Sequence, residues 1–258
     1  MPEEMDLILR IVRTYRPTGR VSIRRIGSFV NDVFLVKVDN EKLVAKRYTN
    51  WVSLKWVTLS LFGLGSVHFS ISGKRRMAAE YAFNDLLSRR GLPVPSILGA
   101  DEKSRTILFT FVSGDQLSSL LPKLAGVAQI GQREREAAYQ AGKLMASAHQ
   151  LEAALGDTKP ENFLVEKKGE VTLVDLEQAR HRGDFAWDLA EFLFYSGHYW
   201  FSFNKTLEGY VDSFIKGYKE EGSASTIKAA ASPRYVRVFS VWTPPNILHN
   251  IRKKLTEI

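Results

Sequence analysis

A polar turn followed by two short apolar runs lies near the middle of the chain and constrains its fold more than any other feature. Residues 156–162 are Gly-Asp-Thr-Lys-Pro-Glu-Asn, and the apolar residues 163–165 and the β-type run 171–174 follow. A hairpin built from these runs would bring the side chains of Asp157, Asn162 and Asp175 to one edge. Magnesium on a nucleotide takes carboxylate or amide oxygens together with water and phosphate oxygens. The stretch therefore predicts a site for a magnesium nucleotide.

The composition excludes several other kinds of chemistry. The chain has 258 residues, 45% of them hydrophobic and 25% charged, which suits one large domain or two packed lobes. It has no cysteine, which excludes disulfides, thiolate metal sites and a cysteine nucleophile. No secretory signal pattern is present at the N-terminus, so we expect a cytoplasmic location. The net charge of +8 favours either an anionic partner, such as a nucleotide, RNA or acidic membrane, or simply a solvated basic surface.

The first part of the chain has the pattern of a helix followed by a small antiparallel sheet. Lys46 lies in the third of these strands, where a buried ammonium group is costly unless it meets an anion. A lysine in a strand is more often an exposed edge residue, so Lys46 alone does not identify a site. The expected helix is 3–15, and the expected strands are 21–26, 33–38, 42–48, 96–99 and 106–112.

A second helix, expected over residues 74–90, carries a candidate partner for Lys46. Glu80 lies three residues before Phe83 and seven before Leu87, which belong to the apolar stripe of this helix, so its side chain can face the sheet. The alternative is a surface ion pair with Arg76 at i,i+4, worth only about 0.3–0.5 kcal/mol. We favour the pairing of Lys46 with Glu80.

An apolar and aromatic stretch, residues 51–72, lies between these two residues. A membrane span needs about 20 mostly apolar residues, whereas this stretch is interrupted by His68, serines and glycines. We therefore expect a lid, a partner-docking surface or additional core rather than a span. Further helices are expected at 133–154 and from 188 to about 222, followed by a basic amphipathic segment near residues 247–255.

These motifs together resemble the catalytic core of the protein-kinase-like superfamily. The run from Asp157 to Asn162 resembles its D-x-x-x-x-N motif, Asp175 resembles its later metal-binding Asp, and Val44-Ala45-Lys46 resembles its V-A-I-K strand. The resemblance implies a bilobal α+β fold. Residues 1–112 would form a small N-lobe with the N-terminal helix, a five-stranded antiparallel sheet, one helix and the insert 51–72. Residues 113–258 would form a mainly helical C-lobe.

The resemblance also implies the chemistry of the polar turn. Asp157 would be the catalytic base that deprotonates the acceptor hydroxyl, and Lys159 would neutralise charge on the transferred phosphoryl group. Asn162 and Asp175 would bind the Mg²⁺ ions that bridge the phosphates. The implied cofactors are therefore ATP and Mg²⁺.

Nucleotide binding is implied for the N-lobe. Lys46, paired with Glu80, would hold the α- and β-phosphates. The turn that begins at Gly27 would cover the phosphates, although its single glycine is equally typical of an ordinary hairpin. The backbone where the lobes meet would contact the adenine edge. The candidate ATP-binding positions besides the ion pair are Gly27, Ser28, Thr110 and Val112.

Three other polar side chains are expected to be structural rather than catalytic. Asp188 is expected to accept backbone N–H bonds from the catalytic turn. His149 lies eight residues before Asp157 and is expected to be structural, because no second ligand at metal-binding spacing accompanies it. Glu177 is expected to form a solvated ion pair with Arg180 or Arg182 rather than to bind a second metal ion.

The details of the turn favour one branch of the superfamily. Lys159 gives the turn a close resemblance to Ser/Thr protein kinases, whereas Gly156 resembles the compact RIO and KEOPS-associated kinases and the aminoglycoside kinases. Only twelve residues separate Asp175 from Asp188, which is too few for a peptide-docking activation segment. We therefore expect an atypical Ser/Thr protein kinase or kinase-like ATPase. Its acceptor would be a protein or the chain itself, and the basic charge suits RNA or an RNA–protein complex as partner.

Two alternatives stay open. A small-molecule kinase for amino-sugars or sugars is favoured by Asn31 in the first turn, which resembles the aminoglycoside and choline kinases, and by the run Asp188-Leu189-Ala190, but Lys159 disfavours it. A non-catalytic scaffold that binds a nucleotide, or a partner through the apolar insert, is supported by the glycine-poor first turn. The full set of polar site residues argues against a scaffold, because a scaffold does not need all of them.

Overall fold

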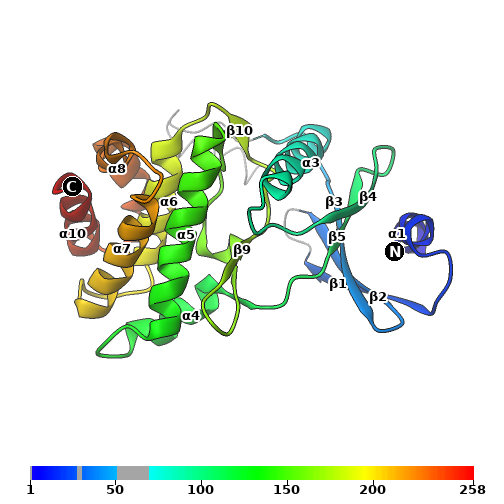
Figure 1. Cartoon of the computed structure of the whole chain (residues 1–258), viewed down its shortest axis with the longest axis horizontal. Helices are drawn as coiled ribbons and strands as arrows, with labels where there is room; N and C mark the ends of the chain where they lie inside the picture. Colours follow the sequence, from blue (N-terminus) through cyan, green and yellow to red (C-terminus); the bar gives the residue numbers. More distant parts are fainter. Residues whose placement is uncertain (1, 28–30, 51–69) are drawn as a thin grey trace.

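The computed structural model describes residues 2–27, 31–50 and 70–258, which form two regions (Figure 1). The N-terminal region is an antiparallel sheet with a helix against each face. The C-terminal region is mainly helical, with three short strand pairings. The chain is therefore an α+β protein with the kinase-like division into a small sheet region and a helical region. The division at residue 112 stays a prediction.

The sheet of the N-terminal region has five strands in the order β1-β2-β3-β5-β4, with every neighbouring pair antiparallel. The strand expected over 106–112 ends two residues earlier, at Thr110, which pairs with Leu43 at the end of the ladder. The strands are β1 (Val21–Gly27), β2 (Asp32–Val38), β3 (Glu41–Arg47), β4 (Ile97–Asp101) and β5 (Thr106–Thr110).

Two helices cover the two faces of this sheet (Figure 1). Helix α1 (Pro2–Tyr15) packs Ile8, Ile11 and Val12 against one face, together with Leu43 and Ala45 of β3. Successive side chains of a strand point to opposite faces, so the residue after Ala45 points to the face covered by α3 (Gly73–Arg89). The alternation along β3 therefore aims Lys46 at α3, away from the apolar core beneath α1.

The C-terminal region is built around α5 (Gln132–Gln150), α6 (Phe185–Gly197) and α7 (Lys205–Tyr218). Its core is aromatic: the rings of Phe192 and Phe214 stack with centroids 4.5 Å apart, and Phe163 meets Phe192 edge to face. Four more helices complete the region, namely α4 (Leu117–Ala125), α8 (Ala224–Ala230), α9 (Pro233–Phe239) and α10 (Pro245–Thr256).

The helical part differs from the sequence expectation in three places. The expected helix from 188 to about 222 is two helices, because the chain turns at residues 198–204 and Asn204 caps α7 by accepting the N–H groups of Thr206 and Leu207. The expected helix 133–154 ends at Gln150, and the chain then enters a strand. Helix α4 was not predicted, although Leu117, Leu120, Leu121 and Leu124 have helical spacing and are buried.

The polar turn and the residues after it form the predicted hairpin. Strand β8 (Phe163–Val165) pairs with β9 (Val171–Leu173), and β8 also pairs with β6 (Asp115–Gln116). The turn itself contains the short helix η1 (Pro160–Asn162). A separate pairing joins β7 (Ala153–Ala154), just before the turn, to β10 (Arg180–His181), just after the hairpin. The segments on both sides of the site are thus anchored.

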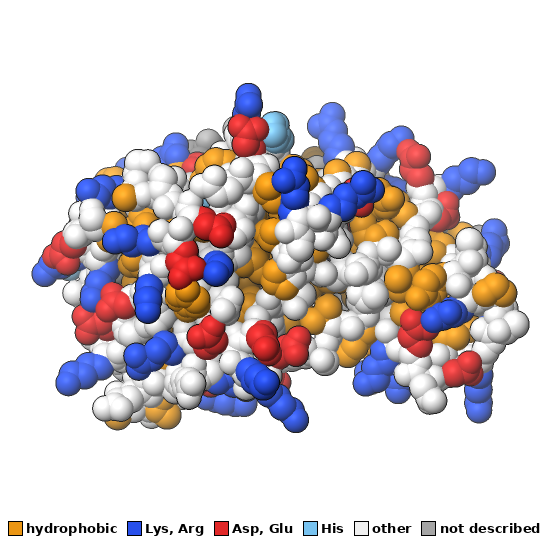
Figure 2. Space-filling view, viewed as in Figure 1, with side chains coloured by type: hydrophobic (Ala, Val, Ile, Leu, Met, Phe, Trp, Pro, Cys, Tyr) orange, Lys and Arg blue, Asp and Glu red, His pale blue; other side chains and the backbone are white. Residues whose placement is uncertain are grey.

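The apolar stretch 51–72 and the basic surface are the two features from which the sequence predicted binding partners. Most of the apolar stretch 51–72 and the candidate residue Ser28 lie outside the described residues. No helix in the described ranges is long and apolar enough to cross a membrane. On the face seen in Figure 2, lysines and arginines are interspersed with acidic side chains rather than gathered into one basic patch.

Candidate active site

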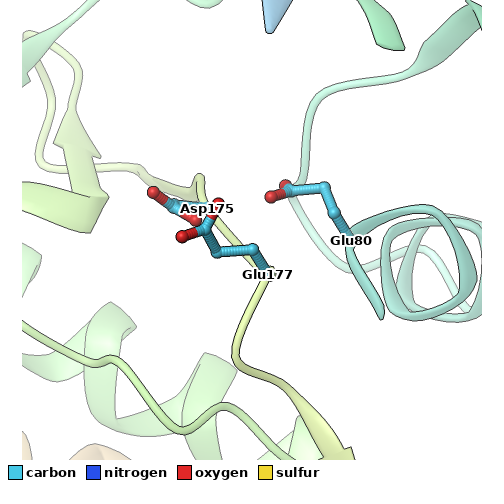
Figure 3. Close-up of side chains that lie close together, drawn as sticks. All are labelled: Glu80, Asp175 and Glu177. Carbon is cyan, nitrogen blue, oxygen red and sulfur yellow. The ribbon is translucent and has the colours of Figure 1, made fainter. Parts of the chain in front are cut away.

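The ammonium group of Lys46 lies among three carboxylates from two separate parts of the chain. Its Nζ is 2.9 Å from Glu80 Oε2, 2.7 Å from Asp175 Oδ1 and 3.2 Å from Glu177 Oε2. Glu80 belongs to α3, whereas Asp175 and Glu177 follow β9, and Figure 3 shows the three carboxylates converging. The predicted ion pair of Lys46 with Glu80 is therefore present, and the candidate metal ligand Asp175 meets the same lysine.

The charges of this cluster interact strongly because most of its side chains are buried away from water. Burial lowers the pKa of Lys46, but Asp175, Glu177 and Glu80 together raise it well above its ordinary value, so the lysine is charged. Burial raises the pKa of Glu80 to about 7, against the opposing effect of Lys46. A buried charge is tolerated only when it is paired, so Lys46 and its carboxylates depend on one another.

Helix α3 presents Glu80 and Arg76 on the same face, because residues four apart are neighbours on a helix. Its first residue, Gly73, lies so close to the end of β3 that an added Cβ would be 2.6 Å from the carbonyl oxygen of Tyr48. The side chain of Asn50 accepts the N–H of Gly73 at 3.0 Å. Helix α3 therefore begins against the strand that carries Lys46.

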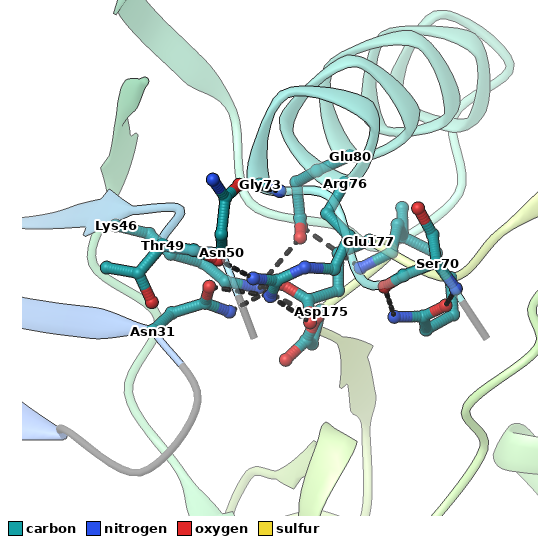
Figure 4. A network of polar contacts seen from close by, with 12 residues as sticks. Asn31, Lys46, Thr49, Asn50, Ser70, Gly73, Arg76, Glu80, Asp175 and Glu177 are labelled. Atoms are coloured by element: carbon teal, nitrogen blue, oxygen red, sulfur yellow. Dashed lines mark hydrogen bonds and ion pairs between the residues drawn. The ribbon is translucent and has the colours of Figure 1, made fainter. Parts of the chain in front are cut away.

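Arg76 and Glu177 differ from their expected positions. Arg76 was weighed as a surface partner of Glu80, and Glu177 was expected to pair in solvent with Arg180 or Arg182. The Arg76 side chain is instead fully buried and bonded to Glu177 at 2.9 Å, and Glu177 is 4% exposed (Figure 4). The two residues are 101 positions apart, so neither local helix spacing nor neighbouring charges could reveal the pair.

The polar turn, residues 156–162, places two charged side chains next to each other. Lys159 Nζ lies 2.9 Å from Asp157 Oδ1. Burial opposes the charge on Lys159, but the carboxylates of Asp157 and Glu191 raise its pKa above the ordinary value. The side-chain amide of Asn162 donates to the backbone oxygen of Asp157 at 2.9 Å. The ion pair and the hydrogen bond therefore fix Asp157, Lys159 and Asn162 relative to one another.

Asp188 accepts backbone hydrogen bonds at the start of this turn, as predicted. Its carboxylate accepts the backbone N–H of Leu155 at 2.7 Å and that of Gly156 at 2.8 Å. His149 Nε2 lies 2.9 Å from the same carboxylate, and His149 Nδ1 lies 2.8 Å from the hydroxyl of Tyr218. Since both ring nitrogens contact side chains of the fold, the structure confirms that His149 is structural.

Gly156 has a steric reason for being glycine. Its φ is +76°, and an added Cβ would lie 2.5 Å from the carbonyl oxygen of Gln178. Gln178 follows Asp175 and Glu177 in the loop after β9, so the absence of a side chain at Gly156 lets this loop pack against the polar turn.

The hairpin brings Asp175 to the turn. The N–H of Val174 donates to the backbone oxygen of Asn162 at 2.8 Å, and the N–H of Leu176 donates to Glu80 Oε1 at 3.0 Å. Asp175 itself adopts φ +69°, a left-handed conformation that is costly for most residues and more accessible to Asp. Its neighbours on both sides are therefore bonded to the turn and to α3, which holds Asp175 in this conformation.

Glu191 is a site residue that the sequence did not reveal. It is 2% exposed, and its Oε2 accepts the backbone N–H of Thr158 at 2.6 Å and lies 3.2 Å from the Thr158 hydroxyl. Burial, with the added charge of Asp157, raises the pKa of Glu191 to about 8. Its position three residues after Asp188, one helical turn further along α6, was the only available signal.

Asn162 and Asp175 carry the kinds of oxygen atom that magnesium takes in nucleotide sites, and their binding of a metal ion stays a prediction. One carboxylate oxygen from each of Glu80, Asp175 and Glu177 lies within 4.8 Å of the others, and Lys46 pairs with all three residues. Glu80 and Glu177 have side chains that are only 3% and 5% exposed, whereas the Asp175 side chain is 32% exposed. The amide nitrogen of Asn162 is engaged with Asp157, and the amide oxygen is the atom that this bond does not use. Mg²⁺ in nucleotide sites takes one or two protein oxygens of this kind.

The remaining candidate ATP-binding positions that the structure describes lie at the ends of strands or just beyond them. Gly27 is the last residue of β1 and is opposite Val33 at an irregular step of the ladder. Thr110 ends β5, and its side chain accepts the N–H of Ser96 at 2.9 Å. Val112 is partly buried just beyond this strand. Their nucleotide contacts stay predictions.

The antiparallel sheet, the helical region and the lysine bound by carboxylates of both regions define a kinase-like phosphotransferase. The sequence model of the phosphotransferase enzyme family, which is part of the protein-kinase-like superfamily, matches residues 22–156, just over half of the chain. The chain belongs to this family. A search of curated proteins gave no match. The matched region contains Lys46 and Glu80 and ends at Gly156, one residue before the candidate base.

Proposed function

We propose that the protein is an ATP- and Mg²⁺-dependent phosphotransferase that acts on a hydroxyl acceptor. The observation that carries the proposal is the 2.7 Å contact between Lys46 of the sheet region and Asp175 of the helical region. A phosphate-binding lysine and a metal-binding carboxylate must approach the same nucleotide phosphates. Their direct contact supports a triphosphate site at this point, since an anionic nucleotide with its metal suits both groups.

The roles proposed for the chain are those of binding, orientation and proton transfer. Lys46, oriented by Glu80, holds the ATP phosphates. Asp157 accepts the proton of the acceptor hydroxyl, and Lys159 beside it balances negative charge on the phosphoryl group. Asn162 and Asp175 hold Mg²⁺, which neutralises phosphate charge when bound.

The first acceptor class that we propose is a Ser or Thr hydroxyl, on a protein or on the chain itself, with an ATPase activity as the variant in which water is the acceptor. This class is supported by Lys159, which occupies the position of the lysine in the motif of Ser/Thr protein kinases and lies 2.9 Å from Asp157. RNA or an RNA–protein complex as partner, a partner at residues 51–72 and a cytoplasmic location belong to the same proposal, and the net charge supports the first of these.

A small molecule such as an amino-sugar or sugar is the second acceptor class. It is supported by the short segment between Asp175 and α6, residues 176–184, which contains the two-residue strand β10 paired with β7. A segment of this length that is also tied to a strand leaves little chain for a peptide-docking platform.

Incubation with γ-labelled ATP and Mg²⁺ tests the function and separates the acceptor classes. We expect wild-type turnover, and a loss of about 100-fold or more in Asp157→Asn and Asp175→Asn. Asp6→Asn, at an exposed position of α1, is the matched control. Label on the protein supports the first class, free phosphate supports an ATPase, and turnover that requires an added amino-sugar or sugar supports the second. Nucleotide binding without any turnover would instead support the scaffold.

A further inference from the structure

The buried guanidinium of Arg76 connects segments that surround the proposed nucleotide site but are distant in sequence. Its Nη1 donates to Asn31 Oδ1 at 2.7 Å and to Glu177 Oε1 at 2.9 Å. Its Nη2 donates to the backbone oxygen of Thr49, just after β3. Figure 4 shows Arg76 between these partners, on the same helix as Glu80. One side chain thus links the first turn, the end of β3 and the loop after β9 to α3.

Asn31 completes this link on the side of the first turn. Its Nδ2 donates to Glu177 Oε2 at 2.5 Å, so Asn31, Arg76 and Glu177 bond to one another pairwise. All three are buried, with exposures of 6%, 0% and 4%. Hydrogen bonds among fully enclosed polar groups are strong and geometrically restrictive, so this triad fixes Asn31 against the loop that carries Asp175.

Arg76 also balances the charge around Lys46. The cluster contains two cations, Lys46 and Arg76, and three carboxylates, Glu80, Asp175 and Glu177. Arg76 bonds to Glu177, the residue two positions after Asp175, and leaves Asp175 as the most exposed carboxylate. Partners of this kind, which orient the groups that touch a ligand, typically change metal affinity or activity by about 10–100-fold when removed.

We propose that Arg76 is a positioning residue for nucleotide binding: by joining Asn31, just before β2, to Glu177, it fixes the start of β2 and the Asp175 loop in the arrangement that receives ATP and Mg²⁺. The inference rests on the proposed function for the identity of the ligand. It assigns Arg76 no contact with the nucleotide.

Equilibrium binding of a fluorescent ATP analogue with Mg²⁺, which requires no acceptor, tests the inference. We expect Arg76→Met to weaken binding by about 10-fold or more. Arg75→Met, at the exposed neighbouring position of the same helix, is the control and should stay within about twofold of the wild type. Equal binding by Arg76→Met and Arg75→Met would overturn the inference.

The double variant Arg76→Met/Glu177→Gln separates positioning from simple charge balance. It removes one positive and one negative charge, so the net charge of the cluster is conserved, and the Gln amide can still accept from Asn31. We expect its thermal stability to recover relative to Arg76→Met, while binding of the analogue stays weak because no guanidinium joins the segments. Recovery of wild-type binding in the double variant would contradict a positioning role.

Hydrogen exchange without nucleotide keeps this inference separable from the proposed function. Arg76→Met should speed exchange of the backbone amides of Asp32 and Leu176 relative to Arg75→Met, because these residues adjoin the two segments that Arg76 joins. If the wild type does not bind the analogue, the proposed function fails, and the exchange result alone decides whether Arg76 holds the segments. Unchanged exchange would overturn the inference.

Discussion

The carboxylate of Glu191 accepts the backbone N–H of Thr158 at 2.6 Å, directly between the candidate base Asp157 and Lys159 in the sequence. Glu191 is buried in α6, and its pKa is raised from 4.5 to about 8. The hydrogen bond to Thr158 favours the charged form, but burial and the nearby charge of Asp157 outweigh it. The carboxylate of Glu191 thus joins the backbone of the polar turn to α6.

We predict that Glu191→Gln flattens the pH dependence of stability. The native state binds the Glu191 proton more tightly than the unfolded state does, so this residue makes stability fall as pH rises from about 4.5 to about 8, by on the order of a few kcal/mol in total. Gln keeps an acceptor for Thr158 and does not titrate. Denaturant unfolding of both proteins from pH 5 to 9 measures the difference. Parallel curves would show that Glu191 does not titrate in this range.

Gly156→Ala should be more harmful than a matched glycine substitution. Gly91 has φ +77°, nearly the same as Gly156 at +76°, but no atom lies within 4 Å of a Cβ built at Gly91. Both variants pay the left-handed cost of about 1–2 kcal/mol, and Gly156→Ala adds a clash with the Gln178 carbonyl worth about 1–3 kcal/mol. Unfolding free energies provide the comparison. We also expect ATP turnover to fall only in Gly156→Ala, and equal effects at the two positions would contradict the proposed packing of the loops.

Lys46→Met should impair both folding and nucleotide binding. Removing the lysine leaves three carboxylates with Arg76 as their remaining cation among the described side chains of the cluster, and breaking a buried pair costs about 3–5 kcal/mol. Lys37→Met, at an exposed position of β2, should change stability by no more than about 0.5 kcal/mol. Unfolding experiments and the labelled-ATP assay test both effects, with turnover expected to fall about 100- to 1,000-fold in Lys46→Met. Unaltered turnover in that variant would rule out the proposed role of Lys46.

Asp188→Ala should destabilise the catalytic turn, because it leaves the buried N–H groups of Leu155 and Gly156 without their acceptor. The expected cost is about 2–6 kcal/mol in unfolding free energy. Asp184→Ala, which removes the cap of the same helix at a more exposed position, should cost only about 0.5–2 kcal/mol. A cost at Asp188 no larger than at Asp184 would show that the turn does not depend on this carboxylate.

The sequence predicted those parts of the site that depend on local spacing. The cost of burying an ammonium group and the resemblance of residues 44–46 to a kinase strand singled out Lys46, helical spacing indicated that Glu80 can face the sheet, and the hairpin pattern indicated that Asp175 lies near Asn162. The Arg76–Glu177 pair was missed because its members lie 101 positions apart in the sequence. A charged pair considered in isolation is also more often solvated than buried. Helix α4 was missed because Pro122 interrupts an otherwise helical leucine pattern. The buried ion pair thus depends on which distant segments pack together, whereas helix α4 was hidden by a local helix-breaking residue.

The pairing of β7 with β10 has a consequence for how the site opens. Ala153 and Ala154, just before the catalytic turn, are hydrogen-bonded to Arg180 and His181, just after the Asp175 loop. The ladder between β7 and β10 therefore joins the polar turn to the loop that carries Asp175, and these two segments cannot separate without breaking it. Local unfolding of segments joined in this way is cooperative, so Asp157 and Asp175 should leave their positions together, and a partly disassembled arrangement should not accumulate.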